Sequence, residues 1–231
     1  MRPKSSIVGQ KSQTPKSLRW RMILAYPGPC SNALVCYALP AQRGNAMSIE
    51  KEAGVPILET ARTILRPHRL GDFETYAAMW AEPAVTRFIG GKPRTREESW
   101  MRFLRHAGLW SLLGYGFWAI EDKATGRFIG EAGFHDLKRE IEPSIEGVPE
   151  AGWALASAAH GHGLASEVVG RVVAWGDEVF GPPGRTVCII DPENGASLKV
   201  AEKNGYRETL RTAYHEKPTI LLERQAGGAI A

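Results

Sequence analysis

Two glycines flank a histidine at Gly161-His162-Gly163, between an apolar run and a segment with helical periodicity. Glycine is costly inside regular structure, so this spacing indicates that the backbone bends there or comes close to another group. A helix that begins at Gly163 would direct unpaired N–H groups and the positive end of its dipole into the loop. The loop is therefore a plain tight turn, a dinucleotide-binding loop, or a cradle for the pyrophosphate of another cofactor.

The dinucleotide-binding interpretation has partial support. Asp191 ends the next strand-like run, as a ribose-binding acid would in a Rossmann unit. However, Ser166 occupies the position of the third glycine, and Asp191 comes later than the usual spacing of about 20 residues. The chain after Asp191 is also too short for the further units of a doubly wound sheet. These departures favour the pyrophosphate cradle.

Periodicity and turn residues divide the chain from about residue 60 into strands and helices. Strand-like runs cover 61–67, 116–122, 126–137, 152–156, 186–191, 206–212 and 218–224. Helical spacing covers 73–82, 95–114, the segment after Gly163, and 194–205. Asp72 is placed to cap the first helix, and Thr95 with Glu98 has the spacing of a capping box. The order predicts one α/β domain of the α+β type, with antiparallel strands in its middle.

Composition limits the classes of function. The chain has 231 residues, of which 43% are hydrophobic, and no run approaches the roughly 18 apolar residues of a membrane span. Cys30, Cys36 and Cys188 form neither a disulfide framework nor a zinc motif, which suits a reducing cytoplasm. Residues 1–49 contain seven basic residues and no acid, which leaves 22 basic and 25 acidic residues elsewhere. This mildly acidic body argues against a nucleic-acid-binding domain.

The first 47 residues differ from the rest of the chain. They have no sustained period and are interrupted by five prolines. Met47 is a second plausible start of translation, so we interpret the residues before it as an over-extended reading frame. A disordered tail and a targeting segment are the alternatives. We expect the folded domain to span 58–225 and residues 226–231 to be frayed.

Three ordered motifs resemble those of the GNAT superfamily of acyl-CoA N-acyltransferases. They are E-A-G-W-A-L at 150–155, A-H-G-H-G-L-A-S-E at 159–167, and D-P-E-N-G-A-S-L-K-V-A-E-K-N-G-Y at 191–206. They are most similar to the branch that resembles bacterial ribosomal-protein N-terminal acetyltransferases. The resemblance implies one domain with a mixed, largely antiparallel sheet of six or seven strands. Helices would cover both faces, and the central strands would splay apart.

The resemblance also implies acetyl-CoA as the cosubstrate, with no metal. The pantetheine arm would enter between the strands at 152–156 and 186–191. The implied cofactor-binding residues are Leu155, Ala156, His160, Gly161, His162, Gly163, Leu164, Ala165 and Asn194; the last could instead only cap a helix. Ala158 stands where the family often has Gln or Arg, and His162 where it favours Arg or Lys. At these two positions, this chain therefore lacks the fixed side-chain charge that the family often supplies to the phosphates.

The implied chemistry is attack of an amine on a thioester, which needs a base, a polarised carbonyl and a proton for the thiolate. Glu150 shares a strand face with the small residues Gly152 and Ala154, which leaves room for a ligand, so it is the leading candidate for the base. Glu131 is the rival. The resemblance places the hydroxyl of Ser197 near the CoA sulfur; the alternative is a solvent-facing helix serine.

These observations predict acetyl transfer from acetyl-CoA to a primary amine of a protein N-terminus or a small molecule. The expected protein is a cytoplasmic monomer or homodimer with no nucleic-acid or membrane partner. The alternative from another class is a CoA-binding sensor or regulatory module that keeps the fold without turnover. A Rossmann oxidoreductase is a third possibility, which a comparison of CoA with NAD binding would separate.

Overall fold

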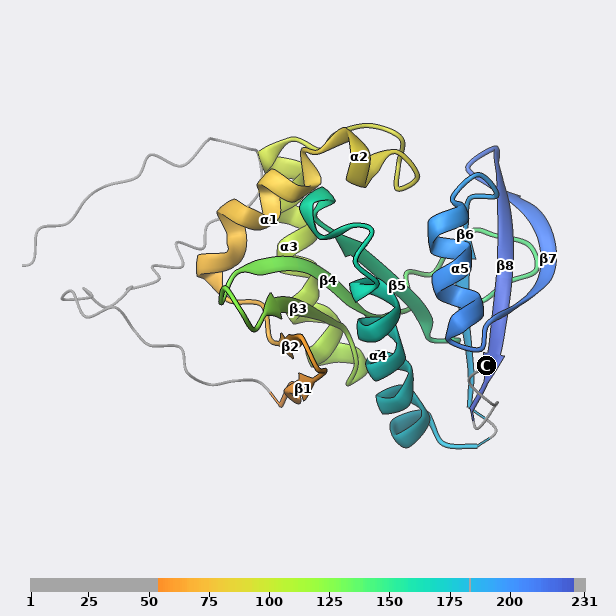
Figure 1. Cartoon of the computed structure of the whole chain (residues 1–231). Coiled ribbons are helices and arrows are strands. Elements are labelled where there is room, and N and C mark those ends of the chain that lie inside the picture. The colour runs from red at the N-terminus through yellow and green to blue at the C-terminus, as the bar shows by residue number, and fades with distance from the viewer. Residues whose placement is uncertain (1–53, 183, 227–231) are drawn as a thin grey trace, which may run out of the picture. The chain divides into compact units, whose positions relative to one another are not determined.

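The computed structural model describes residues 54–182 and 184–226 (Figure 1). The predictions for residues 1–47 and for the end of the chain after residue 226 therefore lie outside the described residues. Within them, the strands are β1 (Leu58–Glu59), β2 (Thr63–Arg66), β3 (Phe117–Asp122), β4 (Phe128–His135), β5 (Glu150–Leu155), β6 (Arg185–Ile190), β7 (Arg207–Tyr214) and β8 (Lys217–Gln225). The helices are α1 (Phe73–Trp80), α2 (Pro83–Thr86), α3 (Arg96–Leu113), α4 (Leu164–Phe180) and α5 (Gly195–Lys203).

The described strands form one mixed sheet in the order β1-β2-β3-β4-β5-β6-β8-β7. All neighbours are antiparallel except β5 and β6. This confirms the predicted fold class and excludes a doubly wound parallel sheet. The sheet has eight strands rather than six or seven, because Leu58 and Glu59 pair with Leu65 and Ile64 as a two-residue edge strand. A segment this short carries no periodicity that a sequence could reveal.

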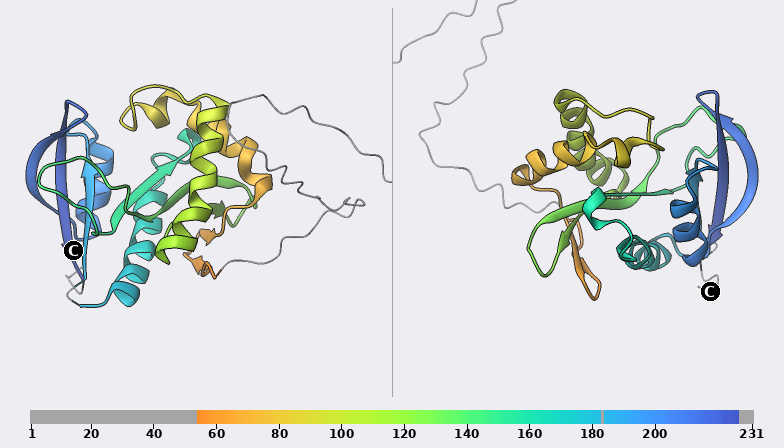
Figure 2. Two further views of the ribbon diagram at one scale, coloured as in Figure 1. Left: turned by 180° about the vertical axis from the view of Figure 1, so that it is seen from behind. Right: turned by 45° about the horizontal axis from the view of Figure 1, so that its top comes forward.

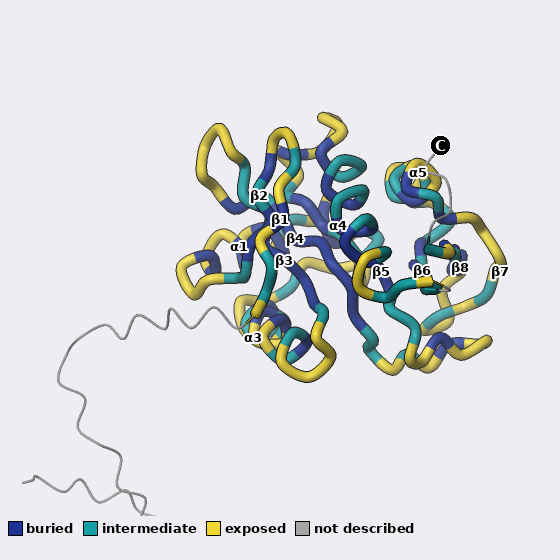
Figure 3. Tube along the Cα trace, turned by 90° about the horizontal axis from the view of Figure 1, so that it is seen from below, coloured by how far each residue is buried: buried dark blue, intermediate teal, exposed yellow. Residues whose placement is uncertain are grey.

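Helices cover both faces of the sheet, as expected (Figure 2). Side chains alternate across β3, because successive residues of a strand point to opposite faces. Trp118 belongs to the core cluster that includes Val168 and Val172 of α4. Ala119, the next residue, belongs to the opposite cluster with Tyr76 of α1. Figure 3 shows these central strands as buried, whereas β7 is largely exposed.

The central strands β5 and β6 part soon after they meet. Their pairing is limited to Glu150 opposite Val187, supported by a hydrogen bond from the Val187 N–H to the Pro149 carbonyl at 3.1 Å. Beyond that point β6 continues to pair with β8, and β5 with β4. The divergence is visible in Figure 1, where β6, β8 and β7 separate from the rest of the sheet. The splayed strands implied by the family resemblance are therefore present.

Helix ends follow the predicted caps with one correction. Thr95 and Glu98 form the expected capping box of α3, and Gly114 ends that helix in a left-handed conformation. Asp72 occupies the N-cap position of α1, but its side chain makes no cap bond to that helix. Its carboxylate instead accepts two hydrogen bonds from the buried guanidinium of Arg66, at 2.7 and 2.8 Å. A buried cation requires a counter-ion, and this demand outweighs the cap.

None of the helices in the described residues combines the length and the apolar composition needed to cross a bilayer.

Candidate active site

The glycine loop leads directly into α4 and leaves the start of that helix open. Gly161 and Gly163 have φ angles of 80° and 74°, a region that glycine enters at no steric cost. Gly163 is the N-cap residue, so no side chain caps the helix. The first N–H groups of a helix have no acceptor within it. The loop therefore presents backbone donors and the positive end of a 17-residue helix to any anion that binds there.

A cation from a distant part of the chain lies beside this loop. Arg62 donates from Nη1 to the carbonyl of His162 at 2.8 Å and from Nε to Glu167 at 2.7 Å. A Cβ added to Gly163 would lie 3.8 Å from Arg62 Nη2. The imidazole of His162 is exposed, and the guanidinium of Arg62 is held beside the loop in an ion pair with Glu167. Sequence reasoning missed it because Arg62 and His162 are 100 residues apart.

The other predicted cofactor residues have different roles in the structure. His160 turns its ring back, so that Nε2 lies 2.8 Å from the carbonyl oxygen of Leu155. Ala156 donates its N–H to the carbonyl of Ile129 at 2.9 Å, which extends the pairing of β5 with β4. Leu155 and Leu164 are buried in the core, and Ala165 is half-buried beside it. These side chains support the loop from within, so the loop offers mainly backbone to a ligand.

A cleft of about 550 Å³ opens where β5 and β6 part. Glu150, Asn194 and Ser197 all line it, so the structure brings three of the predicted site residues together. The predicted residues from Leu155 to Ala165 do not belong to this lining; they follow Ala154, the last residue of β5 that does. The cleft and the loop are thus successive parts of one strand–loop–helix segment.

Asn194 and Ser197 form the start of α5. The Oδ1 atom of Asn194 accepts the backbone N–H of Ser197 at 3.1 Å, which is the bond of a helix cap. The capping role considered for Asn194 is therefore present, while its contact with a cofactor stays a prediction. Ser197 is half-buried and lines the cleft, so it is not a solvent-facing serine.

Glu150 is the buried carboxylate of the cleft. Arg139 donates to both of its oxygens, from Nε at 2.6 Å and from Nη2 at 2.9 Å. Nε2 of His135, opposite Glu150 on β4, lies 3.4 Å from its Oε1. Burial alone would raise the pKa of Glu150, but His135 and Arg139 outweigh it and hold the pKa below its usual value. Glu150 is therefore ionised at neutral pH.

The rival carboxylate, Glu131, has a closed environment. It is fully buried and does not line the cleft. Nη2 of Arg102 lies 2.9 Å and Nε2 of His106 lies 2.7 Å from its oxygens. Burial would raise its pKa, yet these neighbours hold it well below its usual value.

Within the described residues, one group of side chains has the residue types and spacing that could hold a metal ion. It consists of Glu131, His106 and His68, whose potential ligand atoms lie within 4.8 Å of one another. The two imidazoles are stacked, with centroids 4.2 Å apart and planes at 6°, and the Nε2 atoms of His106 and His68 lie 2.7 and 3.6 Å from the same Oε2 atom of Glu131. Arg102 already holds one oxygen of Glu131. The arrangement is that of a buried ion-pair cluster.

Sequence reasoning missed two cleft residues next to Glu150. His135 could have been found from register, because it ends the strand that pairs with β5. Arg139 lies in the polar connection after β4, which carries no periodic signal. Its guanidinium also lies 4.9 Å from the centroid of the Tyr214 ring, which fixes its orientation.

Comparison with known proteins identifies the family. Residues 62–207 match the model of the acetyltransferase (GNAT) domain. The chain belongs to the GNAT acetyltransferase family. A similar GNAT relative is the uncharacterized N-acetyltransferase YoaA of Bacillus subtilis, 32% identical over 157 residues, which cover 66% of this chain and 84% of YoaA. A solved GNAT structure from Bordetella pertussis is 33% identical with a TM-score of 0.65, covering 74% of this chain and 99% of that one.

Two more distant GNAT structures share the fold alone. One is a ribosomal-protein-S5-alanine acetyltransferase from Vibrio fischeri, with a TM-score of 0.57 and 18% identity, covering 75% of this chain and 98% of that one. The other is a spermidine N-acetyltransferase from Vibrio cholerae in complex with CoA and spermine. Its TM-score is 0.56 at 13% identity, covering 72% of this chain and 96% of that one. The neighbours thus include the branch that the motifs resemble.

Proposed function

We propose that this GNAT protein transfers an acetyl group from acetyl-CoA to a primary amine, of a small molecule or a protein N-terminus, by direct attack. The observation that carries the proposal is the cleft between the parted strands β5 and β6, with a half-buried hydroxyl and a buried carboxylate in its lining. A fold of this family without such a cleft would suit only a scaffold.

Acetyl-CoA fits the segment from β5 to α4. The parted edge of β5 offers backbone groups that β6 does not use beyond Glu150, so an extended pantetheine arm would pair there as a strand would. The pyrophosphate would lie on the N–H groups at the start of α4, where Arg62 holds the loop through the His162 carbonyl. A solved neighbour in the family holds CoA, which supports this choice.

Glu150 and His135 would handle the proton of the attacking amine. Glu150 is ionised and held by Arg139, so it stabilises positive charge and orients His135. Both side chains line the cleft, which allows a bound water to link them to the amine. Because its pKa is low, Glu150 alone is a weak base, and the pair is the more effective acceptor.

Ser197 would protonate the leaving thiolate from the opposite wall. Its position in the first turn of α5 brings the hydroxyl into the lining of the cleft. Cys188 also lines the cleft, but burial raises the pKa of its thiol well above the usual value. A thiol that stays protonated is a poor nucleophile, which favours direct attack over an acetyl-enzyme.

The test is release of free CoA from acetyl-CoA, followed with a thiol reagent in the presence of a panel of amines. Acceptor-dependent release with a stable acetylated product would support the enzyme. Tight CoA binding without release for any amine would favour the alternative, a sensor module of the same fold. Mass spectrometry of the amine distinguishes transfer from simple hydrolysis.

A further inference from the structure

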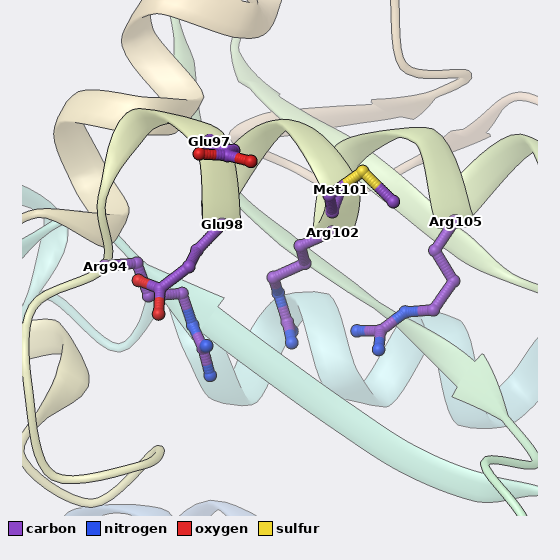
Figure 4. A pocket seen from close by; sticks show the side chains of 6 residues that line it. All are labelled: Arg94, Glu97, Glu98, Met101, Arg102 and Arg105. Atoms are coloured by element: carbon purple, nitrogen blue, oxygen red, sulfur yellow. The ribbon is translucent and has the colours of Figure 1, made fainter. Parts of the chain in front are cut away.

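One wall of the cleft is strongly cationic. Arg94, just before α3, and Arg102 and Arg105 of α3 line both the cleft and an adjoining hollow of about 390 Å³. Figure 4 shows the three side chains extending to the same side, away from Met101. The charged side chains of the cleft lining are Arg87, Arg94, Arg102, Arg105, Arg139, Lys217, Glu150 and Asp191. Positive charge therefore exceeds negative charge in the lining.

Three of these arginines, Arg87, Arg94 and Arg105, form no ion pair with an acid of the described residues, and Arg87 is exposed to solvent. Arg102 is paired with Glu131, and Arg139 with Glu150. For Arg94 and Arg105, no carboxylate of the described residues lies within 4.0 Å of a guanidinium nitrogen, and the buried Nε of Arg94 has no hydrogen-bond partner. Of the acids in the adjoining hollow, Glu97 is exposed and the carboxylate of Glu98 accepts the Thr95 N–H at 2.8 Å. Glu98 partly offsets the charge of Arg94 but forms no ion pair with it, and Glu97 pairs with neither arginine.

The protein holds these charges in place at an electrostatic cost. The guanidinium carbons of Arg94 and Arg102 lie 5.4 and 4.1 Å from the centroid of the Trp80 ring, which fixes their planes. Burial lowers the pKa of Arg94 and of Arg105, and the positive charge of Arg102 lowers both further. An anion bound between them would remove this repulsion, and guanidinium groups match carboxylate and phosphate geometry.

We propose that the acceptor is a primary amine that also carries a carboxylate or a phosphate group, which Arg94 and Arg105 bind. The inference rests on the proposed acetyl transfer: the acyl donor would occupy the β5–β6 side, which leaves the α3 wall to the acceptor. Positive charge near the amine also favours its neutral, nucleophilic form. The same charge disfavours polycationic acceptors such as polyamines.

Matched pairs of amines that differ in the anionic group test this directly. They are O-phosphoethanolamine against ethanolamine, β-alanine against β-alaninamide, and a tripeptide amide that begins with glutamate against one that begins with glutamine. We expect at least a 10-fold higher kcat/KM for the anionic member of a small-molecule pair, of the peptide pair, or of both. A higher kcat/KM in a small-molecule pair indicates a free metabolite as the acceptor, and a higher kcat/KM in the peptide pair indicates a protein N-terminus. Equal rates within every pair, or a preference for spermidine, would overturn the proposal.

Variants locate the anion on the arginines. Arg94→Gln and Arg105→Gln should each raise KM for the anionic amine about 10- to 100-fold, the value of a charge-assisted hydrogen bond, with kcat and the affinity for acetyl-CoA little changed. Arg94→Lys should recover part of the loss. Arg96→Gln is the matched control, because Arg96 lies on the same helix but pairs with Glu74 and is absent from the lining of either hollow. An unchanged KM in both glutamine variants would contradict the assignment.

Calorimetry with O-phosphoethanolamine and the CoA-bound protein separates this inference from the proposed reaction. Binding that Arg94→Gln abolishes, without turnover of any amine, would support the anion site and refute acetyl transfer. Turnover of neutral amines with no binding of the phosphate would refute the anion site alone.

Discussion

Two buried glutamates on neighbouring strands have nearly the same partners but different surroundings. Glu131 of β4 lies against Arg102 and His106, and Glu150 of β5 against Arg139 and His135. Neighbours hold the pKa of each carboxyl below its usual value. The difference is access, because only Glu150 faces the cleft. A buried Glu–His–Arg group is therefore no sign of chemistry unless substrate can reach it.

The largest expected effect is the loss of kcat when Glu150, the carboxylate that faces the cleft, is replaced. Glu150→Gln removes the negative charge beside His135 and should lower kcat about 10²- to 10⁴-fold at neutral pH. Part of the loss should be recovered at higher pH, where more of the amine is neutral. Acetyl-CoA affinity, measured by calorimetry, should change little, and Glu223→Gln in the Arg185–Glu223 pair, which does not line the cleft, is the control. If the folded Glu131→Gln variant loses activity and Glu150→Gln keeps it, then Glu131 is the catalytic carboxylate and Glu150 is not.

The closed site should show its effect in stability. Glu131→Gln leaves the guanidinium of Arg102 without its counter-ion in a buried place, and breaking such a pair costs about 3–5 kcal/mol of unfolding free energy. Urea unfolding followed by circular dichroism measures this. Glu150→Gln should lose less, because its side chain lines the cleft, where water can solvate the new amide, whereas the side chain of Glu131 is fully enclosed. Equal losses of unfolding free energy in the two variants would remove the distinction between an open and a closed site.

Acid should act on the closed site as well. Burial lowers the pKa of His106 to about 4 from 6.5, so the unfolded chain binds a proton there before the folded one does. Stability should therefore fall as pH drops from about 6.5 towards 4, and the low pKa of Glu131 extends the loss below about 4.5. The melting temperature at pH 7.5 and pH 5 measures the slope. His106→Gln, which cannot titrate, should reduce that slope, and an unchanged slope would assign the acid sensitivity elsewhere.

The smallest expected effect is at the glycine loop, which lies on the same segment as the open site. Gly163→Val should weaken acetyl-CoA binding about 10-fold or more, because a β-branched side chain disfavours the φ of 74° and obstructs phosphate approach. Gly126→Val is the matched control, since Gly126 also has a positive φ of 66° with open space around it. Equal affinity in both variants would show that the glycines only make a turn.

Local signals in the sequence predicted much of this fold. The capping box at Thr95, the seven longer strands and the positive φ angles of the glycine loop all follow from residue type and spacing. The gathering of Glu150 and Ser197 in one cleft also matches the motif reading. Each of these features is set by residues close together in sequence or by a motif.

Features that depend on distant contacts could not be predicted. Arg62 reaches the loop from 100 residues away, and Arg94 and Arg105 form a cationic wall only when the fold brings them into the same cleft as β5. Asp72 leaves its helix cap for a buried arginine. Sequence spacing gives no information about which charged side chains will meet across the fold.

The parting of β5 and β6 divides the sheet into two halves that are joined through few bonds. Besides the Glu150–Val187 pairing, β6, β8 and β7 connect to the rest mainly through side chains. Cys188 and Ile190 of β6 share a core cluster with Val168 of α4, α5 packs on α4, and Arg224 pairs with Asp177. Each half has its own internal ladder. A ligand that pairs with the free edge of β5 and touches α5 acts as an additional strand between them. Under the proposed function, acetyl-CoA would be such a ligand, and its binding would stabilise both halves together.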